Sequence, residues 1–278
     1  MQAKTQKPRV LLTGGATGIG AATAERLAAS GAAVTILDVA EPCHGVGAFV
    51  PCDLSDSDAI DAAMNALPEP WDALVNVAGI PGPRPAEPVI AVNFLGLRHL
   101  TQRLLPRMAA GGSVVNITST AAQGWQRRAA VIDALLDTPD FAAGLAWCRA
   151  NGGLWEKDPY TFSKQCVAAW TYRAVGEARA FGVRVNAVSP GGTTTRLSEN
   201  FTAQIGAEQV AWMSSHVGRA ATPDDIAKVI AFVAVGDCGW LNGADIVVDG
   251  GLTAGRIGGW IDFSKSPAML AKASASGG

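Results

Sequence analysis

The glycine-rich segment Thr13-Gly-Gly-Ala-Thr-Gly-Ile-Gly20 is the strongest indication of the fold in this sequence. It follows an apolar run, Val10 to Thr13, and opens a segment with helical patterning, Gly20 to Ala29. Glycines let the backbone approach a pyrophosphate closely, and the start of a helix supplies amide donors and a favourable dipole. An ordinary tight turn is the alternative, but the flanking strand and helix favour a dinucleotide site. The residues predicted to contact the cofactor here are Gly14, Thr17, Gly18, Ile19 and Gly20.

Short apolar runs alternate with longer helical segments along the rest of the chain. The predicted strands are Val10 to Thr13, Val34 to Asp38, Phe49 to Cys52, Ala73 to Val77, Ser113 to Thr118, Val183 to Val188 and Ile246 to Val248. The predicted helices are Gly20 to Ala29, Asp56 to Leu67, Val89 to Met108, Tyr160 to Phe181 and Asp224 to Val235. Near-continuous apolar strands are typical of parallel sheets covered on both faces. We therefore predict an α/β fold with a Rossmann-like, doubly wound parallel sheet and helices on both faces.

Two segments fall outside this alternation. One runs from about Ala121 to Pro159 and carries helical stretches around Ala129 to Leu136 and Phe141 to Ala150; the other is the tail after Gly251. The last helix of the alternating part has a clear start signal, with Thr222 as N-cap, Pro223 at the first helical position and Asp225 in the first turn. We predict a single dinucleotide-binding catalytic domain over residues 1–278, with an insertion at 121–159 and a C-terminal tail at 252–278.

Composition excludes several classes of partner. The chain has 278 residues, 49% of them hydrophobic, and a formal net charge of −2 with no basic stripe, so neither nucleic acid nor an anionic membrane is expected as a partner. The polar N-terminus does not read as a signal peptide, and no apolar run approaches the roughly 18 residues of a membrane span. The five cysteines and three histidines are isolated, which predicts no disulfide framework, no metal site and a cytoplasmic location.

Tyr160 and Lys164 stand four residues apart in Tyr-Thr-Phe-Ser-Lys. On a helix such residues share one face, which places an ammonium beside a phenol. The ammonium can lower the pKa of the phenol and make it a usable acid or base near neutrality. Together with the glycine loop upstream, the pair indicates an enzyme that moves a hydride between a nicotinamide cofactor and a carbinol.

Two carboxylates follow predicted strands. Asp38 ends the second strand, where a carboxylate accepts both ribose hydroxyls and repels a 2′-phosphate. No Lys or Arg lies near Asp38 in the sequence or inside the glycine loop, so NAD is favoured over NADP. Asp53-Leu54 follows the third strand and could hold the adenine edge; alternatively, Asp53 only begins the helix that follows Ser55.

The chain resembles the short-chain dehydrogenase/reductase family over essentially residues 8 to 252. The resemblance rests on motifs in a fixed order, which are Thr13 to Gly20, Asp53-Leu54, Asn76-Val-Ala-Gly79, Asn93 in Val-Asn-Phe-Leu-Gly, Ser119 in Asn-Ile-Thr-Ser, Tyr160-x-x-x-Lys164, Pro190-Gly191 with Thr193 and Thr195, and Asp249-Gly-Gly251. Val77 departs from the pattern, because the family more often has a second Asn there.

The resemblance implies a role for each motif. Tyr160 is the general acid/base, Lys164 lowers its pKa and bonds the nicotinamide ribose, and Ser119 hydrogen-bonds the substrate oxygen. Asn93 supports a water-linked proton relay. Taken singly, Tyr160 could instead be a half-buried aromatic residue of a helix, Ser119 a cap at a strand end and Asn93 a polar residue of a helix. The cofactor contacts implied beyond the glycine loop are Asp38, Asp53, Leu54, Asn76, Ala78, Gly79, Tyr160, Lys164, Pro190, Gly191, Thr193 and Thr195.

The insertion is a departure from most of the family. Residues 120–159 separate Ser119 from Tyr160, whereas family members commonly have far fewer there. Similar insertions occur in the bacterial 3α-hydroxysteroid dehydrogenase/carbonyl reductase branch and in coniferyl alcohol dehydrogenase-like members. The segment is expected beside the active-site mouth. Either its tryptophans line a pocket for a bulky ring-bearing substrate, with Trp125 and Trp155 as contacts, or they form a small core that packs the insertion on the domain.

We thus predict a cytoplasmic NAD-dependent dehydrogenase or carbonyl reductase for a bulky, largely apolar alcohol or ketone. A coniferyl-type aromatic alcohol comes first, and a hydroxysteroid or cyclic terpenoid alcohol next. The family often uses the Tyr160 helix for a four-helix subunit contact, so a homodimer or homotetramer is expected. Two alternative functions are disfavoured. A dinucleotide-binding regulatory protein would normally lose Tyr160 or Lys164, and both are present here. A sugar-nucleotide epimerase or dehydratase of the extended family usually has a longer C-terminal domain and another glycine spacing than this chain.

Overall fold

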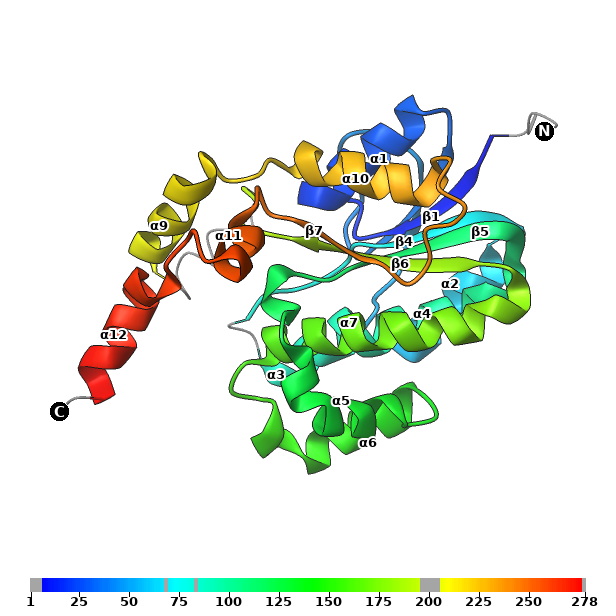
Figure 1. The fold of residues 1–278 in the computed structure, drawn as a ribbon. Helices are drawn as coiled ribbons and strands as arrows, with labels where there is room; N and C mark the ends of the chain where they lie inside the picture. Colours follow the sequence, from blue (N-terminus) through cyan, green and yellow to red (C-terminus); the bar gives the residue numbers. More distant parts are fainter. Residues whose placement is uncertain (1–6, 68–69, 83–84, 196–205, 277–278) are drawn as a thin grey trace.

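Seven parallel strands form one sheet at the centre of the molecule (Figure 1). The computed structural model describes residues 7–67, 70–82, 85–195 and 206–276. The strand order is β3-β2-β1-β4-β5-β6-β7. From β1 the chain adds strands toward one edge, then returns to place β4 beside β1 and adds strands toward the other edge, as in a doubly wound sheet. The strands are β1 (Arg9–Thr13), β2 (Ala33–Asp38), β3 (Ala48–Pro51), β4 (Trp71–Asn76), β5 (Met108–Ile117), β6 (Arg184–Pro190) and β7 (Asp245–Val248). The predicted fold class is therefore confirmed.

Helices cover both faces of the sheet (Figure 1). On one face α1 (Gly18–Ala29) and α10 (Pro223–Val235) pack over alternate strand residues such as Val10 and Leu12. On the other face α2 (Ser57–Ala66), α4 (Leu97–Leu104) and α7 (Pro159–Ala178) pack over the residues between them, such as Leu11. Because side chains of a strand alternate between faces, each strand is buried on both sides, which explains its continuous apolar sequence.

The predicted helix from Val89 to Met108 is divided into several pieces. It comprises α3 (Ala86–Ile90), a π-helical segment Ala91–Gly96, α4 and a 3₁₀ turn Leu105–Arg107. Met108 is not helical as predicted, because it is the first residue of β5 and pairs with Trp71. π-Helical turns inside helices occur frequently at functional sites, and this one contains Asn93.

The insertion, residues 121–159, forms a further layer outside α7. Its two helices, α5 (Ala129–Leu136) and α6 (Phe141–Ala150), have the predicted bounds and lie on the side of α7 away from the sheet (Figure 1). Arg98 of α4 anchors this layer, because its buried guanidinium donates to the carbonyls of Leu135, Leu136, Thr138 and Asp140. Leu135 and Leu136 are the last two residues of α5, and Thr138 and Asp140 follow it, so Arg98 donates to the end of a helix, where backbone oxygens lack helical partners.

The remaining helices lie beyond one edge of the sheet, near β7 (Figure 1). They are α9 (Ala207–Val217), α11 (Leu252–Gly258) and α12 (Pro267–Ser276). The sequence alone did not predict α9. In the part of the chain that the structure describes, no helix combines the length and apolar character needed to cross a membrane.

Candidate functional site

A cavity of about 1200 Å³ opens at the carboxyl ends of the parallel strands. This is the end of a doubly wound sheet at which ligands bind. Its walls combine the glycine loop, the ends of β2, β4, β5 and β6, the start of α7 and the inner side of α9. The cavity contains all of the predicted cofactor residues except Asn76, and it also contains Ser119, Tyr160 and Lys164.

The glycine loop is shaped by close backbone approach. A Cβ on Gly14 would lie 2.5 Å from Ala78 Cα, and a Cβ on Gly20 would lie 1.9 Å from the carbonyl oxygen of Gly14. No larger side chain fits at either position without moving the backbone. Thr17 is the N-cap residue of α1 but its side chain makes no capping bond, and it faces the cavity together with Ile19. The start of α1 therefore presents backbone amides to the cavity, as a pyrophosphate site requires.

Two side chains hold the glycine loop from outside. Asp38 Oδ2 accepts the Ala16 N–H at 2.9 Å, and Oδ1 accepts the Ala40 N–H at 3.1 Å. His44 Nδ1 accepts the Val46 N–H at 3.1 Å, so its other nitrogen, Nε2, donates to the Gly15 carbonyl at 2.9 Å. Sequence reasoning set His44 aside as an isolated histidine. Nothing in the sequence around it indicates this contact, which depends on how the loop after β2 folds back.

The structure separates the two readings of Asp53. Its Oδ1 accepts from the Ser55 N–H and hydroxyl, whereas Asp56 is the N-cap of α2 and accepts from the Asp58 N–H. Asp53 therefore does not start the helix. Asp53 and Leu54 both line the cavity, which leaves the reading of an adenine contact available.

Asn76 is placed differently from its prediction. It is buried in β4, where its Nδ2 donates to Thr101 Oγ1 at 3.0 Å and to Asn116 Oδ1 at 2.9 Å. Asn116 in turn donates to Thr171 of α7 at 3.1 Å. Asn76 thus joins β4, α4 and β5 behind the cavity, and Ala78 and Gly79 are the members of its motif that reach the cavity wall.

Ser119, Tyr160 and Lys164 meet on one wall of the cavity. Ser119 follows β5, and its hydroxyl is hydrogen-bonded to Tyr160. Asp158 caps α7 by accepting the Thr161 N–H, and Pro159 occupies the first turn, so the helix begins directly before Tyr160. Lys164 lies one turn further on, with its Nζ 5.9 Å from the centre of the Tyr160 ring and 2.7 Å from the carbonyl oxygen of Ile117.

Burial dominates the ionisation of this pair. It raises the pKa of Tyr160 to about 12, against the opposing effect of the Ser119 hydrogen bond. Burial also lowers the pKa of Lys164 to about 8. Both shifts disfavour the charged form, as expected for groups removed from water. In the protein on its own the pKa of Tyr160 is therefore raised by burial, and the effect that lowers it comes from Ser119.

Asn93 lies behind Lys164 and is fully buried. Its Oδ1 accepts the Ile80 N–H at 2.8 Å, and its Nδ2 donates to the Ile80 carbonyl at 3.0 Å and to Ser163 Oγ at 3.1 Å. A Cβ on Gly79 would lie 3.4 Å from Asn93 Oδ1 and 3.5 Å from Lys164 Nζ, so the glycine leaves space beside both groups. The structure thus brings Asn93 close to Lys164, as a relay between them would require.

The segment after β6 closes the side of the cavity next to α1. Pro190 ends β6, and Gly191, Thr193 and Thr195 follow along the wall. A Cβ on Gly18 would lie 3.5 Å from Thr195 Cγ2, which places this segment over the start of α1.

The insertion contributes little to the cavity. It reaches the wall at its two ends, through Ala121 and Asp158. Trp155 is 2% exposed, donates to the Cys148 carbonyl at 3.0 Å and stacks on Phe162, so it packs the insertion on α7. Trp125 packs beside Tyr172. Neither Trp125 nor Trp155 is among the described residues that line the cavity, so their positions favour the alternative reading, a small core that packs the insertion on the domain.

An apolar wall comes instead from segments near the C-terminus. Val210, Met213 and Val217 of α9 and Leu252 of α11 line the cavity, where they are joined by apolar residues from the segment after β4, including Ile80 and Pro81. Helical spacing of Val210, Met213 and Val217 is the signal from which this face of α9 could have been found. Within the described residues, no cluster of three or more His, Cys, Asp or Glu side chains is arranged to hold a metal ion.

Comparison with known proteins agrees with this fold and site. Residues 8–131 match the family model described as short chain dehydrogenase, and residues 143–253 match the model described as Enoyl-(Acyl carrier protein) reductase. The chain is an oxidoreductase that belongs to the short-chain dehydrogenase family. It is 35% identical over 247 residues to coniferyl-alcohol dehydrogenase of Pseudomonas sp. (strain HR199 / DSM 7063), an alignment that covers 88% of this chain and 96% of the relative.

Two solved structures illustrate the similarity further. The NADH complex of the 3-alpha-hydroxysteroid dehydrogenase from Pseudomonas sp. B-0831 has a TM-score of 0.73 and 27% identity, covering 91% of this chain and 100% of that one. A putative 2-deoxy-d-gluconate 3-dehydrogenase from Agrobacterium tumefaciens with bound NADP has a TM-score of 0.69 and 27% identity, covering 90% and 98%. Of these two similar structures, one was thus solved with NADH and the other with NADP.

Proposed function

We propose that this chain is an NAD-dependent dehydrogenase that interconverts an alcohol and its carbonyl compound. The observation that carries the proposal is the meeting of Ser119, Tyr160 and Lys164 on one wall of a cavity that also contains the glycine loop. Ser119 and Tyr160 would both contact the substrate oxygen, and Lys164 lies one helical turn from Tyr160 on α7. This is a general acid/base with a positioning hydroxyl and a nearby cation.

Tyr160 is the residue that exchanges the proton with the substrate in this reaction. In the oxidative direction the phenolate of Tyr160 takes the hydroxyl proton of the alcohol, while Ser119 holds the same oxygen by a hydrogen bond. The bound nicotinamide supplies the acceptor of the hydride. Lys164 carries a positive charge below about pH 8, and this charge favours the phenolate, as the positive charge of bound NAD⁺ would also do. A water beside Gly79 would pass the proton onward, since the space there lies near both Asn93 Oδ1 and Lys164 Nζ.

The residues around the glycine loop fit a nicotinamide dinucleotide. Gly14 and Gly20 let the loop backbone pack closely on Ala78 and on itself, which shapes the turn where the pyrophosphate would bind at the start of α1. Pro190, Gly191, Thr193 and Thr195 form the opposite side of the cavity. The preference for NAD rests on Asp38, because its carboxylate at the end of β2 accepts ribose hydroxyls and repels a 2′-phosphate. Val39 and Ala40 follow it, so no cation stands beside it in the sequence to offset that repulsion.

The substrate is a bulky, largely apolar alcohol. Val210, Met213, Val217 and Leu252 present apolar surface to the cavity that contains Ser119 and Tyr160. An aromatic alcohol of the coniferyl type is the first candidate, supported by the similarity to coniferyl-alcohol dehydrogenase. A hydroxysteroid or cyclic terpenoid alcohol is the second, supported by the similarity to a 3-alpha-hydroxysteroid dehydrogenase.

We also propose a homodimer in the cytoplasm as the working form. Arg173 on the outer side of α7 pairs with Asp133 at 2.7 Å and with Asp137 at 2.6 Å, so the insertion covers a face that a four-helix contact would need. This favours a dimer over a tetramer. The five cysteines are free, and burial raises the pKa of Cys52 to about 11 and of Cys148 to about 12. Such thiols suit a reducing compartment.

A substrate panel tests this function. Aromatic, steroid and terpenoid alcohols are each incubated with the enzyme and NAD⁺ or NADP⁺, and the absorbance of the reduced nicotinamide is followed. We expect turnover of at least one ring-bearing alcohol, with higher kcat/KM for NAD⁺. The absence of reduced nicotinamide with every alcohol, together with no oxidation of NADH by the matching ketones, would remove the proposal.

A further inference from the structure

One wall of the cavity is built from two segments that are far apart in the sequence. The segment after β6, residues 191–195, runs beside residues 219–222, which lead into α10. Ala221 N–H donates to the Gly192 carbonyl at 2.9 Å, and Thr194 N–H donates to the Ala221 carbonyl at 2.8 Å. These bonds form a short parallel bridge between Thr193 and Ala221. Gly191 N–H also donates to the Val248 carbonyl at 2.9 Å, which fixes the start of this segment to β7. Beyond Gly191, the position of the segment depends on what holds residues 219–222.

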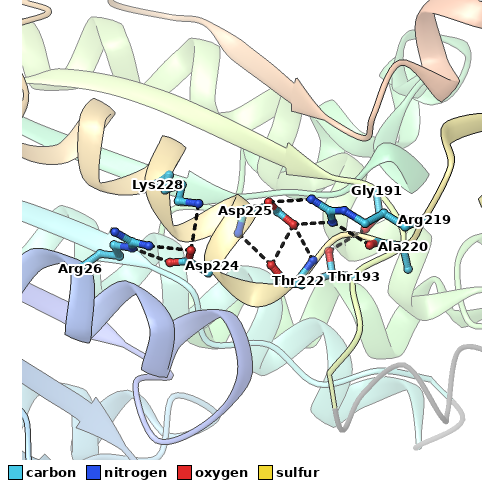
Figure 2. Close-up of polar contacts among 9 residues, drawn as sticks. All are labelled: Arg26, Gly191, Thr193, Arg219, Ala220, Thr222, Asp224, Asp225 and Lys228. Carbon is cyan, nitrogen blue, oxygen red and sulfur yellow. Dashed lines mark hydrogen bonds and ion pairs between the residues drawn. The ribbon is translucent and has the colours of Figure 1, made fainter.

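A single carboxylate holds them. Asp225 receives two parallel bonds from the guanidinium of Arg219, from Nη1 to Oδ2 at 2.7 Å and from Nη2 to Oδ1 at 3.0 Å (Figure 2). Arg219 Nη1 also donates to the Ala220 carbonyl at 2.9 Å. Parallel bonds of this kind fix orientation as well as distance. Arg219 and Asp225 both lie on the cavity wall.

The same carboxylate also starts α10. Asp225 Oδ2 accepts from the Thr222 N–H and from the Thr222 hydroxyl, both at 2.8 Å, and Thr222 Oγ1 accepts the Asp225 N–H at 3.3 Å. This is a capping box, which fixes the entry of the chain into the helix (Figure 2). Asp225 thus connects a rigid helix, packed on the sheet, to a segment that shapes the cavity.

We propose that Arg219 and Asp225 are positioning residues for the bound dinucleotide, because they hold residues 191–195 in place over the start of α1. The inference rests on the proposed function. Thr195 lies next to Gly18 at the start of α1, so a shift of this segment changes the space left for the cofactor between them. Ordering the segment in advance removes a cost that binding would otherwise carry.

Asp224 offers a matched control. It is the neighbouring residue in the first turn of α10, but its carboxylate points away from residues 191–195 and pairs with Arg26 of α1 at 2.6 Å and with Lys228 at 3.0 Å (Figure 2). This ion pair is exposed, and buried residues such as Leu27 and Ile226 already hold α1 against α10. Asp224→Asn and Asp225→Asn therefore make the same change of charge at the same end of the same helix.

The experiment compares NADH binding and steady-state kinetics in the full-length protein. For Asp225→Asn we expect the Kd for NADH and the KM for NAD⁺ to rise about threefold to tenfold, the effect of losing the ion pair with Arg219 and weakening the capping box, with kcat at saturating cofactor within about twofold. Arg219→Gln keeps the capping box and should weaken NADH binding in the same way. Asp225→Glu preserves both contacts and should restore it. Asp224→Asn should leave the Kd unchanged.

Each alternative outcome is distinguishable. Equal Kd values for wild type, Asp225→Asn and Arg219→Gln would overturn the positioning role while leaving the proposed function in place. Equal losses of affinity in Asp224→Asn and Asp225→Asn would assign the effect to helix charge and overturn it as well. A wild-type protein that binds neither NADH nor NADPH would sink the proposed function, and the inference with it. Thermal unfolding of each variant establishes that the compared proteins are folded.

Discussion

Lys164 donates a hydrogen bond from its Nζ to the carbonyl oxygen of Ile117 at 2.7 Å. The bond joins α7 to the last residue of β5, two residues before Ser119. The helix that carries Tyr160 and the strand end that carries Ser119 are thus held together by the cation of the site. Lys164 is buried, and it donates to a carbonyl and not to a carboxylate, so its positive charge is costly in the folded protein.

The first prediction concerns the stability of the protein without cofactor. Burial lowers the pKa of Lys164 from 10.5 to about 8, so between these values the unfolded chain binds the proton that the folded protein has lost. Stability rises with pH wherever the unfolded state binds more protons. From about pH 8 to pH 10.5, the free energy of unfolding of the wild type should rise relative to Lys164→Met, by about 3 kcal/mol.

Urea unfolding of both proteins across this range measures the difference. A gap between wild type and Lys164→Met that does not change with pH would show that Lys164 is not a buried cation in the folded protein.

The second prediction concerns the cofactor. Asp38→Asn removes the negative charge that opposes a 2′-phosphate, while the amide oxygen can still accept the Ala16 N–H. We expect the ratio of kcat/KM for NAD⁺ to that for NADP⁺ to fall by about tenfold or more, chiefly through better use of NADP⁺. Initial rates with the two cofactors give the ratio. Comparable kcat/KM for both cofactors in the wild type would refute the preference itself.

The third prediction separates cavity residues from insertion residues. Met213 lines the cavity, so Met213→Ala should lower kcat/KM for a bulky alcohol by about tenfold, the effect of losing a few apolar contacts. Trp125 packs on Tyr172 outside the cavity, so Trp125→Ala should change kcat/KM for the same alcohol by less than about twofold. The reverse order of effects would return the insertion tryptophans to the substrate pocket.

The fourth prediction concerns the attachment of the insertion. Arg98→Met leaves the carbonyls of Leu135, Leu136, Thr138 and Asp140 without this donor. We expect the free energy of unfolding to fall by about 2–4 kcal/mol, because several carbonyls would lose a charged donor at once. Limited proteolysis should then cut first within residues 121–159. Unchanged cleavage of that segment would show that Arg98 does not anchor it.

Much of the fold could be predicted because the strands and one helix start follow from simple physical requirements that appear in the local sequence. Strands buried on both faces need continuous apolar sequence, and Pro223 with Thr222 and Asp225 marks a helix start by local geometry alone. The break at Ala91–Gly96 was not predictable in this way, because the apolar spacing continues through a π-helical segment with little change. Met108 was assigned to the wrong element because both a buried helix end and a buried strand start accept methionine.

The candidate site likewise contains residues that local sequence spacing predicts and residues whose contacts it does not predict. Gly14, Gly20, Ser119, Tyr160 and Lys164 could be found from the sequence because their spacing reflects a requirement of the local backbone or of one helix face. Trp155 was open to two readings, since a large aromatic serves a pocket and a small core equally well. Long-range contacts had no local signature: His44 reaches Gly15, and Asn76 reaches Asn116, only after the sheet has formed.

The kinetics of Tyr160→Phe test the proposed acid/base role of Tyr160. The variant keeps the ring and loses the hydroxyl, which is hydrogen-bonded to Ser119 and which, in the proposed mechanism, exchanges the substrate proton. We predict that kcat falls by at least ~10²–10⁴-fold, the usual contribution of general acid–base catalysis, while the Kd for NADH stays almost the same. Near-normal turnover by Tyr160→Phe would contradict the assignment of Tyr160 as the acid/base.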